Sequence, residues 1–244
     1  MVTKLERVYQ QLLLRYGPQG WWPLLDLHLN GGKNPTKTGS VEGYHPHDYT
    51  FPKTRLQQFE ICVGAILTQN TAWPNVEKAL INLKRINCLD PKQLLGGKDE
   101  HLLEAIRPAG YFNQKMQYLK VFAAFFLTLG RTKIPTREEL LALKGIGNET
   151  ADSMLLYAFN QPVFIVDAYT RRIGVALNLF DEKATYHEIQ GVFEKKVPKN
   201  ILVCQEFHAL LVEHAKRYYA KKPYGSEDWL LPLFFRVSEP PETL

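Results

Sequence analysis

The chain has 244 residues, 45% of them hydrophobic, which is enough for one or two packed cores. A formal net charge of +5 and a pI near 9.0 are compatible with a polyanionic partner without requiring one. Three cysteines, no apolar run near the length of a membrane span and no signal-type segment after Met1 argue against disulfide-rich, membrane and secreted classes, so we expect a cytoplasmic protein.

The N-terminal part predicts a helix followed by a tryptophan-containing loop. Apolar residues recur at helical spacing over residues 4–16, and Gly17-Pro18 ends the helix. Trp21, Trp22 and Pro23 follow in the loop. Two adjacent tryptophans do not easily face one core direction, so at least one is a candidate to line a cavity or contact a ligand. Packing of both against the core is an equally good interpretation.

A long loop without periodicity is expected over about residues 26–52, and a loop of this length is either functional or mobile. It contains His45-Pro46-His47-Asp48, whose residue types suit a metal ion. No partner motif of suitable spacing accompanies this cluster, so we expect no metal site.

Amphipathic helices are predicted through the middle of the chain. An apolar helix over residues 56–70 ends in a polar stretch containing Gln69 and runs on to Trp73, and a simple helix cap would explain the polar residues. Shorter helical patterns follow up to Ile106. The turn around Tyr111 then leads to Lys115 and a helix over residues 114–129.

Residues 136–159 predict two helices joined by a tight turn. Thr136 with Glu139 has the capping-box pattern that starts the first helix. Lys144 precedes the turn Gly145-Ile146-Gly147, and glycines permit both the tight turn and the close approach of another backbone. The amides of such a turn suit a phosphate oxygen, although a plain helix connection is the commoner reason for this pattern.

The second helix of this pair is predicted from about Asn148 to Phe159. Its apolar positions leave Glu149 and Asp152 for the outer face. The apolar run 163–166, the only candidate strand, then ends at Asp167, with Arg171 shortly after it. A long helix over residues 201–219 completes the pattern, so the fold class should be all-α.

The hairpin followed by Asp167 resembles the helix-hairpin-helix DNA glycosylases of the endonuclease III-like, or HhH-GPD, superfamily. Asp167 falls where that family has its catalytic aspartate. The family's bifunctional members carry a nucleophilic lysine 18 residues before the aspartate, and position 149 is glutamate here. Glutamate cannot form a Schiff base. The resemblance therefore implies a monofunctional glycosylase that uses water.

The same resemblance assigns roles on DNA to other residues. Gln69 matches the glutamine that fills the gap left by an extruded nucleotide, and Tyr111 matches a residue that wedges between the opposite bases. Contacts with the DNA backbone are implied for Lys144, Gly145, Gly147, Asn148, Lys115 and Arg171.

One branch of the superfamily, which removes 3-methyladenine and lacks an iron–sulfur cluster, is most similar in its motifs. The matching segments are W-W-P, G-A-I-L-T-Q-N-T, R-P-A-G-Y-F-N-Q-K, K-G-I-G-N-E-T-A-D and V-D. The resemblance implies a base pocket made by Trp21, Trp22, Pro23 and Trp73, with Glu149 orienting the base or the water. The four cluster cysteines of many relatives have no counterpart after residue 218, so we expect no iron–sulfur cluster and no cofactor beyond a possible monovalent cation at the hairpin.

The sequence thus predicts a monomeric base excision repair enzyme that acts on double-stranded DNA with alkylated bases. The resemblance implies two helical subdomains with the active-site cleft between them: residues 1–55 plus 166–244, and residues 56–165 with the helix-hairpin-helix at about 136–159. Two alternatives stay open, a mismatch or other damaged-base glycosylase of the same fold and a non-catalytic DNA-binding protein that keeps the hairpin.

Overall fold

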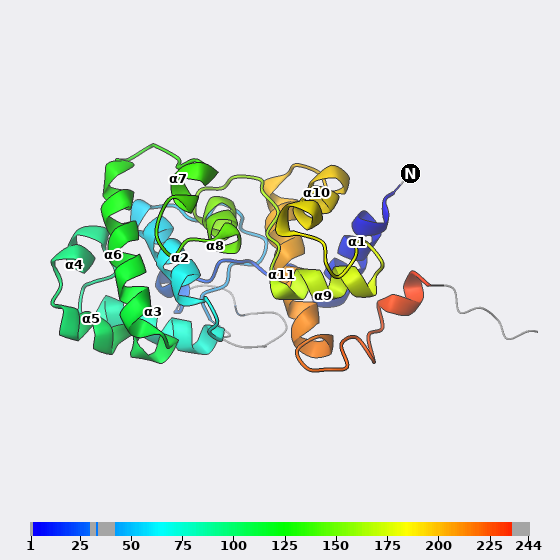
Figure 1. Cartoon of the computed structure of the whole chain (residues 1–244), viewed down its shortest axis with the longest axis horizontal. Helices are drawn as coiled ribbons and strands as arrows, with labels where there is room; N and C mark the ends of the chain where they lie inside the picture. The colour runs from blue at the N-terminus through cyan, green and yellow to red at the C-terminus, as the bar shows by residue number, and fades with distance from the viewer. Residues whose placement is uncertain (1, 30–32, 34–41, 236–244) are drawn as a thin grey trace, which may run out of the picture.

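The computed structural model describes residues 2–29, 33 and 42–235, and these residues form helices and loops with no β-strand (Figure 1). The all-α fold class is therefore confirmed. Residues 30–32 and 34–41 of the predicted loop lie outside the described part of the chain. No helix in that part is long and apolar enough to cross a membrane.

One group of helices follows the N-terminal loop and lies on the left of Figure 1. It comprises α2 (Arg55–Leu67), α3 (Trp73–Arg85), α4 (Pro91–Gly96), α5 (Asp99–Ile106), α6 (Phe112–Thr128), α7 (Arg137–Leu141) and α8 (Asn148–Ser153), which continues as the π-helical turn η3 (Met154–Ala158).

A second group combines the two ends of the chain on the right of Figure 1. It comprises α1 (Lys4–Tyr16), α9 (Ala168–Ala176), α10 (Tyr186–Lys196) and α11 (Ile201–Tyr218). Three short 3-10 turns lie elsewhere in the chain: η1 (Leu25–Leu27), η2 (Arg107–Ala109) and η4 (Leu231–Leu233). The predicted capping box at Thr136 is confirmed, and others start α1 and α10.

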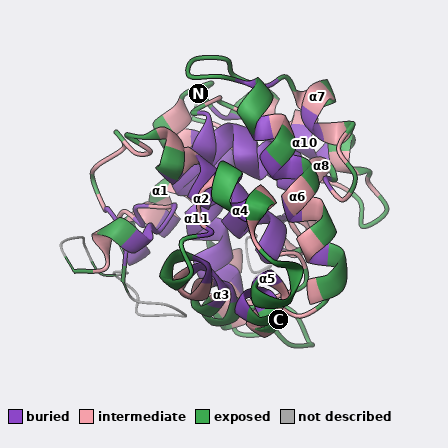
Figure 2. Ribbon diagram, turned by 90° about the vertical axis from the view of Figure 1, so that its left-hand side faces the viewer, coloured by how far each residue is buried: buried purple, intermediate pink, exposed green. Residues whose placement is uncertain are grey.

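Two hydrophobic cores underlie the two groups. The first forms around α2, and the second joins α1, α9, α10 and α11; Figure 2 shows the buried stretches of α2 and α11 in purple. Residues 163–166 run between the cores, with Val163 and Ile165 in contact with the first and Phe164 and Val166 in the second. This alternation is the period of an extended backbone, so the segment joins the cores without forming a strand.

The hairpin turn depends on Gly145. This residue has φ +87°, and a Cβ there would lie 2.3 Å from the ring of Tyr118. Gly147 differs, because its φ is −97° and a Cβ would meet nothing within 4 Å. Packing within the chain therefore requires glycine at position 145 and leaves the surface over position 147 open.

Gly145→Ala should destabilise the fold by about 2 kcal/mol or more, because it combines an unfavourable backbone conformation with a steric clash. Gly147→Ala, its matched control two residues away, should unfold at nearly the wild-type midpoint. Urea titrations of the two variants measure the difference, and equal losses would contradict this account of the turn.

Candidate functional site

Asp167 begins α9 as its N-cap residue. Its Oδ1 accepts the backbone N–H of Thr170 at 2.6 Å, which satisfies one of the free amides at the helix start. The side chain is half-buried, and within the described part of the chain its other oxygen, Oδ2, accepts no hydrogen bond. Asp167 therefore has a fixed orientation and one oxygen that remains available.

Glu149, in the first turn of α8, lies close enough to Asp167 to feel its charge. Removal of water by the surrounding protein, helped by the charge of Asp167, raises the pKa of Glu149 to about 7. The side chain nevertheless remains exposed to solvent. The site thus pairs two carboxyl groups, one of which changes protonation near neutral pH.

Three tryptophans pack together where the N-terminal loop meets the start of α3. Trp22 is the central one, 7% exposed, with its ring 6.2 Å from Trp21 and 5.3 Å from Trp73, both in edge-on geometry. A Cβ at Gly64 of α2 would come within 3.2 Å of the Trp22 indole nitrogen. Trp21 and Trp73 are half-buried, so part of each ring is exposed to solvent. Trp22 is instead an anchor, a buried side chain that fixes the loop to the first core. Pro23 is buried as well.

His208 and Tyr157 connect the tryptophans to Asp167. The His208 ring lies 6.0 Å from both Trp21 and Tyr157. Burial lowers the pKa of His208, and the charge of Asp167 and a hydrogen bond with the backbone of Ile165 act in the opposite direction. Neither residue stands out in the sequence, because a lone histidine or tyrosine in an apolar helical run carries no local signal.

The loop that carries the tryptophans is held by a buried acid on α11. Glu206 accepts the backbone N–H groups of Gln19 at 2.8 Å and Gly20 at 3.0 Å. His45 supports the same loop, since its Nε2 lies 2.9 Å from the Trp22 carbonyl and its Nδ1 2.6 Å from the Asp48 carbonyl. His45 is therefore engaged with the backbone, and the described residues contain no group of three or more possible metal ligands.

The two predicted wedge residues lie in different environments. The Gln69 amide donates to the Gly145 carbonyl at 2.8 Å and to Thr150 Oγ1 at 3.0 Å, so it would have to leave the hairpin to enter a duplex. Tyr111 is 68% exposed and has φ +47° at the start of α6. Both roles on DNA stay predictions.

The structure differs from the predicted DNA-backbone contact of Lys115, because this side chain is buried. It is only 2% exposed, and its Nζ donates to the carbonyls of Leu67 and Ala109 and to Thr71 Oγ1 at 2.7–2.9 Å. Burial lowers the pKa of Lys115 to about 8. The residue is a structural link between the end of α2 and η2.

The other residues predicted to contact the DNA backbone differ in exposure and in their bonds within the protein. Lys144 and Gly147 are exposed at the turn, and Gly145 is half-buried. Asn148 Oδ1 accepts from Arg137, and Arg171 donates to the carbonyls of Ala184 and Glu182. The surface at the turn is thus formed chiefly by its backbone and by Lys144.

Comparison with known proteins places the geometry in context. Residues 63–199 match the family model described as HhH-GPD superfamily base excision DNA repair protein. A candidate DNA repair glycosylase of Methanocaldococcus jannaschii is 39% identical over 226 residues, 88% of this chain and 89% of that protein. Endonuclease III of Thermotoga maritima is 27% identical over 154 residues, 62% of this chain and 71% of the enzyme.

Two solved structures share the architecture. The 3-methyladenine DNA glycosylase of Helicobacter pylori bound to 1,N6-ethenoadenine is 28% identical, with a TM-score of 0.67 over 88% of this chain and 98% of that one. A trapped endonuclease III–DNA covalent intermediate has a TM-score of 0.70 over 97% of each chain at 16% identity, which supports the fold alone.

Glu149→Gln should stabilise the protein more at about pH 8 than at about pH 5. The pKa of Glu149 is higher in the folded protein than in an unfolded chain, so ionisation of the wild-type residue costs stability as the pH rises from about 4 to 7. Glutamine does not ionise. Melting temperatures measured across this range test the difference.

The same comparison in an Asp167→Asn background should show a smaller effect of pH, because the charge of Asp167 is the second cause of the shift. Glu138→Gln, on the exposed face of α7, is the matched control. A melting-temperature gain that does not depend on pH would contradict the account.

Proposed function

The chain belongs to the HhH-GPD superfamily of base excision DNA repair proteins. From this premise we propose that it removes alkylated purines, chiefly 3-methyladenine, from double-stranded DNA by hydrolysing their N-glycosidic bonds. That it is a DNA-binding base excision repair glycosylase follows from the family. The damaged base, the use of water and the roles of individual residues are the proposal.

One observation carries the choice of substrate: the half-buried Trp21 packs against the rings of His208 and Tyr157, and both of these residues lie close enough to Asp167 to feel its charge. A purine alkylated on a ring nitrogen is cationic, so it is a good leaving group. The electron-rich faces of tryptophan attract such a cation. The H. pylori 3-methyladenine glycosylase, similar in sequence and structure, agrees with this choice.

The chemistry is assigned to Asp167, with Glu149 beside it. After the nucleotide is flipped out of the duplex, the Asp167 carboxylate stabilises the positive charge that develops on the sugar or activates the attacking water. Glu149 orients the base or the water, and with its pKa near 7 it can accept or return a proton. Because position 149 is not a lysine, no strand cleavage through a Schiff base is expected from it.

DNA would be held by the hairpin and the exposed wedge. The backbone amides around Gly147, with Lys144 beside them, suit a phosphate of the strand that carries the damage. Tyr111 would enter the opposite side of the duplex, and Gln69 would fill the gap after leaving the hairpin. We propose that the protein works as a cytoplasmic monomer without an iron–sulfur cluster or another cofactor.

A second candidate is a glycosylase for a neutral damaged or mispaired base. Lys216 Nζ lies 5.7 Å from the centre of the Trp21 ring, and a positive charge there would repel a cationic base. Burial lowers the pKa of Lys216, with the neighbouring Glu213 acting in the opposite direction. A thymine-DNA glycosylase of Aeropyrum pernix is 27% identical over 173 residues, so this alternative stays within the family.

Wild-type protein should release free 3-methyladenine from methylated duplex DNA, and Asp167→Asn should reduce the rate by about 100-fold or more, because the carboxylate charge is lost. Release of the base and alkali-independent strand cleavage are followed in parallel. Base release without strand cleavage supports hydrolysis by water. Cleavage that keeps pace with release would refute the monofunctional mechanism, and release from T·G or deaminated duplexes only would favour the second candidate.

Trp21→Ala and Trp22→Ala should separate base recognition from packing. Trp21→Ala should slow the release of 3-methyladenine by about tenfold or more with a modest change in melting temperature, because a half-buried stacking surface is lost. Trp22→Ala should destabilise the fold by about 3–5 kcal/mol, as expected for a buried aromatic side chain. Equal effects of the two variants on stability and on excision would contradict this division.

A further inference from the structure

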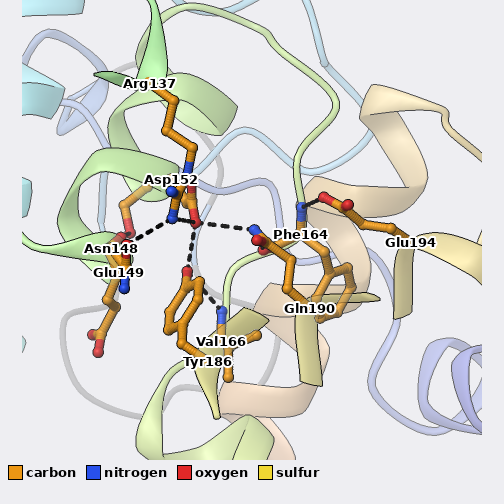
Figure 3. A network of polar contacts seen from close by, with 10 residues as sticks. Arg137, Asn148, Glu149, Asp152, Phe164, Val166, Tyr186, Gln190 and Glu194 are labelled. Carbon is orange, nitrogen blue, oxygen red and sulfur yellow. Dashed lines mark hydrogen bonds and ion pairs between the residues drawn. The ribbon is translucent and has the colours of Figure 1, made fainter. Parts of the chain in front are cut away.

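Asp152 lies at the centre of a buried polar network (Figure 3). The sequence predicted it on the outer face of its helix, and that prediction is wrong, because Asp152 is 0% exposed. The apolar spacing along one helix does not reveal the partners of Asp152, because Arg137, Tyr186 and Gln190 come from other helices. A buried carboxylate is costly unless it is fully paired, so its partners show what it does.

Two elements of the hairpin meet on this carboxylate. Arg137 of α7 donates through Nε to Asp152 Oδ1 at 2.7 Å and through Nη2 to Oδ2 at 3.1 Å. The same Nη2 also donates to Asn148 Oδ1 at 2.9 Å, next to the glycine turn. The charge and hydrogen bonds of Asp152 raise the pKa of Arg137. Asp152 therefore fixes α7 against the start of α8.

The other partners come from α10, in the second core. Tyr186 donates its hydroxyl hydrogen to Asp152 Oδ2 at 2.7 Å, and the Gln190 amide donates to the same oxygen at 3.0 Å. Burial, and next to it the charge of Asp152, raises the pKa of Tyr186, so the phenol stays a donor. The carboxylate thus joins helices from both halves of the fold.

From α10 the network continues to the segment that carries Asp167. The Val166 N–H donates to the Tyr186 hydroxyl at 3.3 Å, and Gln190 donates to the Phe164 carbonyl at 2.8 Å. Glu194 accepts the Phe164 N–H at 3.3 Å. Val166 directly precedes Asp167, so a continuous path of hydrogen bonds runs from the hairpin to the residue before the reacting carboxylate (Figure 3).

We propose that Asp152 is a positioning residue which, through Tyr186 and Gln190, fixes the Asp167 segment relative to the hairpin. The hairpin sets where the DNA backbone lies, and Asp167 acts on the sugar of the extruded nucleotide. A loss of this link would leave both parts intact but misplace one relative to the other, and a shift of about 1 Å can cost 10²-fold in rate. The inference rests on the proposed roles of Asp167 and the hairpin and does not depend on which base is removed.

Tyr186→Phe is the sharpest test, because it removes one hydroxyl and with it both bonds of the path. Tyr219→Phe is the matched control: its hydroxyl also donates to a buried aspartate, Asp228 Oδ2, at 2.6 Å, and within the described part of the chain the partners of Asp228 include none of residues 163–167. Both variants should lower the melting temperature, since each loses a buried hydrogen bond.

Single-turnover excision should separate the two variants. Tyr186→Phe should excise about tenfold or more slowly while its Kd for duplex DNA stays within about twofold of wild type. Tyr219→Phe should excise at the wild-type rate. Asp152→Asn combined with Tyr186→Phe should be little slower than the slower single variant, because both act through one link. Wild-type excision by Tyr186→Phe, or an equal loss in Tyr219→Phe, would overturn the proposal.

Amide hydrogen exchange provides a readout that needs no substrate. The Val166 amide should exchange faster in Tyr186→Phe than in wild type, and its exchange rate in Tyr219→Phe should equal that of wild type. Excision is measured on methylated, deaminated, T·G and oxidised duplexes, with the variants compared on whichever substrate wild type processes. If that substrate is not alkylated, the proposed substrate fails and the positioning test still stands. If wild type excises no base, the proposed function fails. Even then, equal Val166 exchange rates in wild type and both variants would overturn the proposed link from Asp152 through Tyr186 to Val166.

Discussion

No strand lies beside residues 163–166 in the described part of the chain, so side chains bond several of the polar backbone groups of this segment. α10 supplies the side chains that bond Phe164 and Val166, and the buried Asp152 orients two of them. Because the segment runs between the two cores and ends at Asp167, these hydrogen bonds hold the backbone that leads into Asp167. The N-cap bond at the start of α9 then orients it.

α11 plays a comparable part for the aromatic side of the site. Its Glu206 binds the backbone just before Trp21, its His208 touches the Trp21 ring, and the Gln205 carbonyl accepts the Tyr157 hydroxyl at 3.0 Å. Burial raises the pKa of Glu206, while the two N–H donors favour its charged form. One helix therefore holds a loop that lies almost 190 residues earlier in the chain, and it packs Trp21 against His208.

Lys115 and Asp152 show why local pattern misassigns polar residues. Helical spacing predicted that Asp152 faces outward, and the family resemblance implied that Lys115 contacts the DNA backbone. Each is instead surrounded by partners that are distant in sequence: Lys115 by carbonyls at the end of α2 and in η2, and Asp152 by Arg137, Tyr186 and Gln190. Whether a charged residue is solvated or buried in a network depends on what the folded chain brings against it.

The sequence by itself determined the all-α class, the first helix and its end at Gly17, the capping box at Thr136, the glycine turn and the glutamate at position 149. These features depend on spacing, capping and backbone conformation within a few residues, which a linear reading contains. Only the tertiary structure decided that Trp22 is an anchor, that Lys115 is buried, that His208 adjoins Asp167 and that Asp152 joins the hairpin to the Asp167 segment. Each of these depends on long-range packing of elements whose relative placement no local pattern specifies.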